Sequence, residues 1–387
     1  MHDVSDRMTQ TEQDPFFDIR PYHDQEVAGA IADLIADQEF IKAILHYRFP
    51  HLSGPFGWLL SPLVKAALKR KWSSLNSVRD VQLQVAAYMK KTMANTTTDF
   101  SYSGVERLKK NQAYLFISNH RDIAMDPAIV NWCLHKYGMN TARIAIGDNL
   151  LKKDCVTTLM RLNKSFIVRR SAKGPREMLK ALGQLSAYIH HSLGTEKQSI
   201  WIAQREGRAK DGNDYTDAAM LKMLYIEGRK QGLSFAEDIG QLHIVPVTIS
   251  YELDPCDKAK VRELVQKQMQ GHYQKGEFED IDSIIQGITG MKGRVHVAFG
   301  EMVQPNVDSA DELASALDAE IYRNYRLFPI NYLAAGVEHD SVTAEDRALW
   351  QAKLAEHSEA EQHWLKTMYG APVFKLKQQA EQDAPTQ

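Results

Sequence analysis

Short apolar runs alternate with helical patterns along the central part of this chain, and that alternation constrains the fold more than any other feature. Six runs read as buried strands: 113–118, 143–146, 165–168, 199–203, 243–251 and 294–299. The helices expected around them lie near 127–137, 150–162, 175–192, 218–229, 258–269 and 310–324. Strands that alternate with helices pair in parallel through crossover connections. The sequence therefore predicts an α/β fold with a mostly parallel sheet sandwiched by helices.

Helical patterns flank this region on both sides. An all-helical unit is expected over residues 23–98, behind a polar stretch, 1–22, that is expected to be disordered. The α/β domain is expected over 99–330, and a helical, partly disordered tail over 331–387. A chain of 387 residues is long enough for this division.

The charge is balanced overall but not locally. A net charge of −2 argues against a nucleic-acid-binding protein as a whole. Between residues 65 and 91, however, seven basic side chains accompany a single acid, Asp80. A basic patch of this kind can bind an anionic surface even when the chain is nearly neutral.

Part of this basic segment is expected to form an amphipathic helix over 60–72. Ser61 and Pro62 are typical of an N-cap and of the first helical position. The expected apolar face consists of Leu60, Leu63, Val64, Ala67 and Leu68. Trp58 and Trp72 stand at the two ends. Such a helix suits a membrane interface, but the same face would equally well pack on a protein core.

The expected compartment follows from cysteine use and from hydropathy. Cys133, Cys155 and Cys256 show no metal-ligand spacing, and a sparse, odd number of cysteines fits a reducing compartment. We expect no secretory leader at the polar N-terminus. The longest uncharged run near it, 49–64, contains three prolines and is shorter than the roughly 20 apolar residues that span a membrane. A cytoplasmic protein is therefore expected.

The first strand is followed by Ser-Asn-His-Arg-Asp-Ile-Ala-Met-Asp-Pro, residues 118–127. His120 falls at a strand-to-helix turn, and Asp122 and Asp126 come close behind it. An imidazole with an unperturbed pKa of about 6.5 accepts a proton near neutral pH. A carboxylate on its other nitrogen would fix the tautomer. No serine or cysteine elbow accompanies the pattern, so a substrate hydroxyl is the expected nucleophile.

Asp126 also has a purely structural interpretation. Asp before Pro127 is typical of a helix N-cap, and Gly138 is a typical helix end. Either Asp126 or Asp122 could orient the histidine. We favour Asp126 because it keeps the proline that follows it.

Arginines follow two later strands. These side chains are Arg169 and Arg170 after the strand at 165–168, and Arg205 and Arg208 after the strand at 199–203. Each group could be a solvated ion cluster if taken alone. Ligands bind beyond the carboxyl ends of strands in such sheets, so we expect these arginines to converge on His120. Guanidinium groups bind phosphate in a bidentate manner, which predicts a phosphate-bearing substrate whose hydroxyl a histidine deprotonates.

Taken in order, these residues resemble the glycerolipid acyltransferases, the family that makes lysophosphatidate and phosphatidate. Four blocks carry the resemblance: Asn119-His120 with Asp126-Pro127, residues 166–170, Glu206-Gly207-Arg208, and residues 244–247. The resemblance covers roughly residues 100 to 300.

Three departures from the family pattern stand out. Five residues separate His120 from Asp126, where the family has four. The third block lacks a small residue between Gly207 and Arg208, and Asn163 stands near a position where the family tends to have glycine.

The resemblance implies an O-acyltransferase of phospholipid biosynthesis, which uses acyl-CoA or acyl-ACP and glycerol 3-phosphate or lysophosphatidate. It implies no metal and no other cofactor, and a peripheral location on the inner face of the membrane. The implied catalytic residues are His120, Asp126 (or Asp122) and Glu206. The implied phosphate ligands are Arg169, Arg170, Arg208 and Arg205. The implied structural or acyl-site residues are Asn119, Phe166, Gly207 and Pro246.

Two other functions fit parts of the pattern. The altered third block fits a non-catalytic acyl- or lipid-binding protein with a degenerate site. His120, Asp122 and Asp126 could instead hold a metal in a phosphohydrolase, although few further ligands follow the strands.

Overall fold

A computed structural model describes residues 14–49, 53–276, 279–304 and 306–383. Most of the stretch predicted to be disordered, 1–13, lies outside these ranges, as do residues 384–387. Of the other residues in that stretch, 15–20 form turns and a bend, in which Ile19 is buried and Arg20 pairs with Asp14. The chain divides into two compact units, which are Met1–Tyr88 with Ala142–Tyr188, and Met89–Thr141 with Ile189–Gln387.

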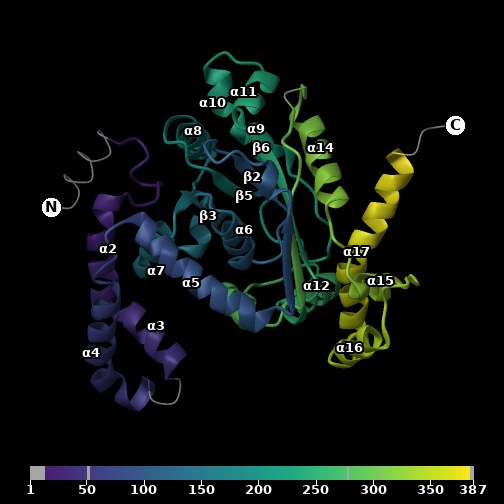
Figure 1. Ribbon diagram of the computed structural model, residues 1–387, viewed down its shortest axis with the longest axis horizontal. Helices are drawn as coiled ribbons and strands as arrows, with labels where there is room; N and C mark the ends of the chain where they lie inside the picture. The colour runs from purple at the N-terminus through teal and green to yellow at the C-terminus, as the bar shows by residue number, and fades with distance from the viewer. Residues whose placement is uncertain (1–13, 50–52, 277–278, 305, 384–387) are drawn as a thin grey trace. The chain divides into compact units, whose positions relative to one another are not determined.

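Three helices of the first unit lie side by side (Figure 1). They are α2 (Asp24–Ala36), α3 (Gln38–Arg48) and α4 (Ser53–Trp72). α5 (Val78–Thr96) starts in this unit, and α7 (Asp154–Leu162) packs against α2. Val27, Leu34 and Leu162 belong to their shared apolar core.

The start that the sequence predicted for α4 is wrong. The helix begins at Ser53 and contains Pro62 in its interior, so Ser61 is not its N-cap. A helix can continue through a proline when the loss of one backbone donor is offset by packing. The predicted apolar face is also not buried as a whole: Leu60 and Val64 are half-buried, whereas Leu63 is 65% exposed.

The strands of the first unit are β3 (Arg143–Gly147) and β4 (Ser165–Val168), which pair in parallel. A short 3-10 helix (Asp148–Leu150) follows β3. After β4 comes α8 (Pro175–His190), which continues into a π-helix (His191–Thr195) where the sequence predicted α-helix to residue 192.

The sheet of the second unit has the strand order β1-β7-β6-β2-β5. Its strands are β1 (Asp99–Ser103), β2 (Leu115–Ser118), β5 (Ile200–Ala203), β6 (Ile244–Tyr251) and β7 (Arg294–Phe299). Neighbouring strands are parallel, except for β6 with β7. β1 was not expected from the sequence, and its pairing is with β7. β2 and β6 are buried along their whole lengths, so they lie within the core.

The second unit also contains many helices. They are a 3-10 helix (Val105–Arg107), α6 (Met125–Lys136), α9 (Ala218–Leu224), α10 (Ile226–Lys230), α11 (Phe235–Gln241), α12 (Asp257–Gln270), α13 (Glu279–Thr289), α14 (Ala310–Arg323), α15 (Pro329–Ala335), α16 (Ala344–Ala355) and α17 (Glu359–Asp383). The C-terminal helices α15, α16 and α17 lie together (Figure 1). Among the described residues, no helix is both long enough and apolar enough to cross a membrane.

The predicted fold class is confirmed: the protein is α/β, with a mostly parallel sheet, helices before it and a helical C-terminal region. The boundaries near residues 98 and 330 stay predictions, because compact units need not coincide with domains that fold alone.

Candidate active site

The candidate site lies at the carboxyl end of β2, where parallel strands place the following loops together. The register sets Ser118 beside Ala203 of β5 and Val247 of β6. The loop after β5 starts with Gln204, whose backbone N–H donates to the carbonyl of Ser118 at 2.8 Å. The turn that carries His120 and the loop that carries Arg208 therefore leave the same edge of the sheet.

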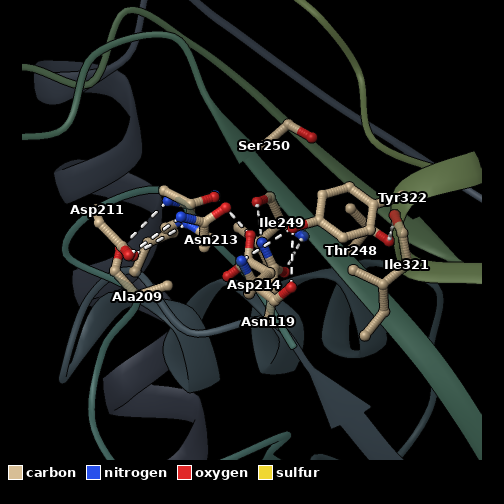
Figure 2. A network of polar contacts seen from close by, with 12 residues as sticks. Asn119, Ala209, Asp211, Asn213, Asp214, Thr248, Ile249, Ser250, Ile321 and Tyr322 are labelled. Carbon is tan, nitrogen blue, oxygen red and sulfur yellow. Dashed lines mark hydrogen bonds and ion pairs between the residues drawn. The ribbon is translucent and has the colours of Figure 1, made fainter. Parts of the chain in front are cut away.

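Asn119 fixes the start of the turn. Its side-chain nitrogen donates to the carbonyl of Ile249 at 3.0 Å, and its side-chain oxygen accepts from the N–H of Ile249 at 2.8 Å (Figure 2). The side chain thus extends the ladder between β2 and β6 by one pair. Because Asn119 is fully buried, losing these bonds would leave unsatisfied polar groups in the core.

His120 and Asp126 form a hydrogen-bonded pair. The Nδ1 of His120 lies 2.8 Å from Oδ2 of Asp126, whose side chain is fully buried. The imidazole is 15% exposed and meets the ring of Trp201 edge-to-face, with centroids 5.9 Å apart. With Nδ1 engaged by the carboxylate, Nε2 is the nitrogen available to a substrate proton. This is the geometry of a general base with an orienting carboxylate.

Among the described residues, Asp126 accepts four hydrogen bonds. Oδ2 also accepts from the backbone N–H groups of Arg121 at 2.6 Å and Asp122 at 2.9 Å. Oδ1 accepts from the hydroxyl of Tyr251 at 2.8 Å. Burial and the nearby charge of Asp126 raise the pKa of Tyr251 well above its ordinary value, so its phenol is a neutral donor. These donors hold both oxygens of the Asp126 carboxylate in place.

Asp122 occupies a different position. Its Oδ1 accepts from the backbone N–H groups of Ala124 at 3.0 Å and Met125 at 2.8 Å, at the start of α6. The alternative interpretation of Asp126 as an N-cap is therefore wrong, because α6 begins at Met125 and the carboxylate of Asp126 accepts hydrogen bonds from the preceding turn. Burial raises the pKa of Asp122, and the charge of Asp126 adds to the effect.

Arg121, the residue after the histidine, is buried and joins the turn to the loop that follows β5. Its guanidinium lies 2.5 Å from Oδ2 of Asp214 and donates to the carbonyls of Ala209 and Gly212 at 3.3 and 3.2 Å. Asp214 is held in turn by Tyr322, whose hydroxyl contacts its backbone N–H and carbonyl (Figure 2). Burial raises the pKa of Asp214, and the charge of Arg121 offsets that effect only in part.

A buried lysine on α12 holds the same turn by its backbone. The Nζ of Lys260, 1% exposed, donates to the carbonyl of Arg121 at 2.6 Å and forms an ion pair with Asp254. Burial opposes ionisation of Asp254, but the charge of Lys260 and its hydrogen bond hold the pKa of that carboxyl below its usual range. Asp254 also donates its N–H to the hydroxyl of Tyr369 on α17, so the C-terminal helices support the turn indirectly.

The loop after β5 carries the predicted third block. Gly207 has φ +78°, a left-handed conformation that favours glycine, and Glu206 is exposed. Arg208 donates from Nη2 to the hydroxyl of Ser283 at 3.4 Å, and the guanidinium of Arg205 stacks 4.1 Å above the ring of Tyr215. The N–H of Ala209, the residue after Arg208, donates to the carbonyl of His120 at 2.9 Å. This bond joins the loop to the histidine turn.

The other predicted site residues lie in two places. Arg169 and Arg170 follow β4 in the first unit, where Arg169 is 3.2 Å from Asp18 and the N–H of Arg170 donates to Asp148 at 3.1 Å. Their convergence on His120 stays a prediction. Phe166 is buried in β4 with its ring centroid 5.0 Å from that of Tyr188. Pro246 lies in buried β6 and accepts from the N–H of Gly300 at 2.8 Å.

Sequence reasoning missed Tyr251, Asp214 and Lys260. Tyr251 carries a usable signal, since it ends a strand, and the carboxyl ends of strands are where ligands bind. Asp214 and Lys260 lie in no motif, and only the folded chain brings them to Arg121. Over the described ranges, no group of three or more His, Cys, Asp or Glu residues is placed to hold a metal ion.

The fold and the site together define an α/β protein with a histidine–aspartate pair at the carboxyl end of a central strand. Residues 99–250 match the model of the Acyltransferase family, which confirms the predicted resemblance at that level. The chain is also similar to the crystal structure of the 1-acyl-sn-glycerophosphate (LPA) acyltransferase PlsC from Thermotoga maritima, with a TM-score of 0.38 and 14% identity over 74% of this chain and 93% of that one. This likeness is too distant to support a conclusion about activity. No curated protein matches the sequence.

Proposed function

We propose that this protein is an O-acyltransferase of phospholipid biosynthesis, which moves a fatty acyl group from acyl-CoA or acyl-ACP to a hydroxyl of glycerol 3-phosphate or lysophosphatidate. One observation carries the proposal. The 2.8 Å contact between His120 and Asp126 lies inside the segment that matches the Acyltransferase family. The phosphate-bearing acceptor rests on the resemblance of the arginine blocks.

In the proposed reaction, Nε2 of His120 removes the proton of the acceptor hydroxyl while its oxygen attacks the thioester carbonyl. A carbon–oxygen bond forms, the carbon–sulfur bond breaks, and the leaving thiolate takes the proton back from the imidazolium. Asp126 stabilises that imidazolium. General base catalysis of this kind contributes typically about 10²–10⁴-fold. Backbone N–H groups near residues 206–208 would meet the negative oxygen of the tetrahedral intermediate.

The arginines would hold the acceptor phosphate. Arg208 is the best supported, because its neighbour Ala209 is hydrogen-bonded to the backbone of His120. Arg205, Arg169 and Arg170 are proposed as further ligands, and Glu206 as a partner of an arginine or of the glycerol hydroxyl. Guanidinium groups suit this role because they bind phosphate through two parallel hydrogen bonds.

The test is release of free thiol from acyl-CoA and from acyl-ACP, with each acceptor in turn. His120→Ala should lower turnover by about 10²–10⁴-fold. His135→Ala is the matched control, because it removes an imidazole of α6 that stacks on Trp132. Circular dichroism should show both variants folded. Near-normal acyl transfer by His120→Ala would refute the assignment of His120.

The same assay addresses the alternative of a non-catalytic lipid-binding protein. Radiolabelled acyl groups that bind to the wild-type protein but never pass to any acceptor would favour that alternative. Transfer to one acceptor, with a rate that depends on the carrier, would identify both substrates.

We further propose that α4 binds the inner face of the membrane. Trp58, Leu59 and Leu63 of this helix are 77%, 53% and 65% exposed. Lys69, Arg70 and Lys71 are exposed in its last turns. Exposed tryptophan and leucine beside a basic cluster are typical of helices at an anionic lipid interface.

Liposome co-sedimentation tests this proposal. Binding should require anionic lipid, weaken with salt, and be lost when Lys69, Arg70 and Lys71 are all replaced by glutamate. Replacing the exposed Lys222, Arg229 and Lys230 of α9 and α10 by glutamate is the control for net charge, because these residues lie outside the basic segment. Binding that does not respond to salt, or no binding at all, contradicts the proposal.

A further inference from the structure

Tyr251 contacts the carboxylate oxygen of Asp126 that does not bind His120. It is the last residue of β6, which pairs with β2 on one side and with β7 on the other. Its side chain is buried and its hydroxyl donates to Oδ1 of Asp126 at 2.8 Å. Because the backbone of Tyr251 pairs with Val295 of β7, the phenol is held by the sheet itself.

The two oxygens of Asp126 are satisfied in different ways. Oδ2 accepts from His120 and from two backbone N–H groups of the turn. Within the described part of the chain, Oδ1 accepts from Tyr251 alone. Since Asp126 is fully buried, the phenol is what satisfies the side of the carboxylate that faces away from the histidine.

Several charged groups surround the pair formed by His120 and Asp126. Acidic groups that act on Asp126 or Tyr251 are Asp122, Asp214 and Asp254. The basic groups near the pair are Arg121 and Lys260. Two further cations act on its neighbours: Arg208 on Cys256, and Lys292 on Asp122 and Cys256. Arg121 and Lys260 are already paired with Asp214 and Asp254. A carboxylate in such acidic surroundings binds an imidazolium tightly unless its charge is shared with another donor.

We propose that Tyr251 is a positioning residue for the proposed acyl transfer: its hydroxyl shares the charge of Asp126, holds the carboxylate in place, and so limits how strongly Asp126 stabilises the imidazolium form of His120. The inference rests on the proposed function for its role in catalysis. The hydrogen-bond effect on His120 itself can be measured without any substrate.

Tyr251→Phe removes the hydroxyl and keeps the ring. Without that donor, Asp126 holds the imidazolium more strongly, so the pKa of His120 should rise by about 0.5–1 unit. NMR titration of histidine-labelled protein reads this value directly, and the His120→Ala spectrum identifies the signal. An unchanged titration of His120 in the folded variant overturns the inference.

The pH profile of kcat/KM gives the second readout. The acidic limb should move to higher pH by the same amount in Tyr251→Phe, with a loss of about 3–10-fold below the limb and recovery above it. A tyrosine that only supports the fold would lower activity equally at every pH, and that outcome also overturns the inference.

Tyr114→Phe is the matched control. Tyr114 is a buried tyrosine just before β2, and its hydroxyl accepts from the N–H of Lys109 at 2.7 Å, at the other end of the strand. Its removal should leave the titration of His120 and the acidic limb unchanged. A shift equal to that of Tyr251→Phe would mean that the effect is not specific to the pair.

Fluorotyrosine placed at position 251 keeps the inference testable if Tyr251→Phe does not fold. A fluorinated phenol is a stronger donor, so the pKa of His120 should fall instead of rise. No change there overturns the inference. A shift in an enzyme without acyl transfer would refute the proposed function alone, whereas transfer without any shift would refute only the role of Tyr251.

Discussion

The turn after β2 and the loop after β5 leave the same edge of the sheet but are built in opposite ways. In the turn, Asn119, Arg121 and Asp126 are buried and hydrogen-bonded to the body of the protein. In the loop, Glu206 and Gly207 are exposed, and the guanidinium contact of Arg208 is long, at 3.4 Å. A proton transfer needs a fixed geometry, whereas an arginine that binds phosphate can adjust to its ligand.

This difference separates the expected effects of substitution. Removing one partner in the turn leaves a buried polar group without its hydrogen bond, which costs stability as well as activity. Removing an exposed side chain in the loop should change substrate binding and little else.

The largest difference in kcat should appear between variants of the two aspartates of the turn, Asp126 and Asp122. Asp126→Asn removes the charge that stabilises the imidazolium, so kcat should fall by about 10³–10⁴-fold. Asp122→Asn keeps an oxygen for the N–H groups of Ala124 and Met125 and should cost less than about tenfold. Steady-state kinetics on folded protein checks both. Equal losses would mean that Asp122 shares the role of Asp126.

Arg121→Ala should produce the largest loss of stability. It leaves the buried carboxylate of Asp214 without its cation, so the free energy of unfolding should fall by about 3–5 kcal/mol. Arg208→Ala in the loop should change it by less than about 1 kcal/mol. Urea unfolding measures both values. Similar losses in the two variants would remove the contrast between turn and loop.

The free energy of unfolding should also depend on pH through Asp318 of α14. Its carboxylate accepts from the hydroxyl of Thr216, near the end of the loop after β5, at 2.6 Å. Burial raises the pKa of Asp318 to about 6. Between about pH 4 and pH 6 the folded state therefore binds more protons than the unfolded state, and the free energy of unfolding falls as pH rises.

Asp318→Asn should remove about 2 kcal/mol of that fall, measured by urea unfolding at a series of pH values. Asp311→Asn, on an exposed part of the same helix, is the control and should leave the slope unchanged. A wild-type slope that persists in Asp318→Asn would place the titrating group elsewhere.

The smallest effect on kinetics should come from replacing Arg208 in the loop after β5. Arg208→Gln should raise the KM for the phosphate-bearing acceptor about tenfold, which corresponds to about 1.4 kcal/mol, and change kcat by less than about threefold. Initial rates over a range of acceptor concentrations separate the two constants. Loss of kcat with an unchanged KM would show that Arg208 acts on the transition state rather than on acceptor binding.

Local patterns predicted most of the sheet. β2, β4 and β6 fall where short apolar runs had indicated strands, because burial of a strand on both faces requires such runs. β1, with the sequence Asp-Phe-Ser-Tyr-Ser, has no such run, since it is less buried than the central strands. The start of α4 was misplaced because the preference of proline for a first helical turn did not prevail over packing against α2 and α3.

The sequence by itself determined that a histidine, two carboxylates and several arginines would follow strands of a mostly parallel sheet, because these features depend on neighbours along the chain. Only the tertiary structure decided that Asp126 and not Asp122 contacts the imidazole, and that Tyr251, 125 residues away, bonds the same carboxylate. The reason is physical. A hydrogen bond between distant residues forms only when strand register and burial bring the two groups within 3 Å, and no short stretch of sequence encodes that meeting.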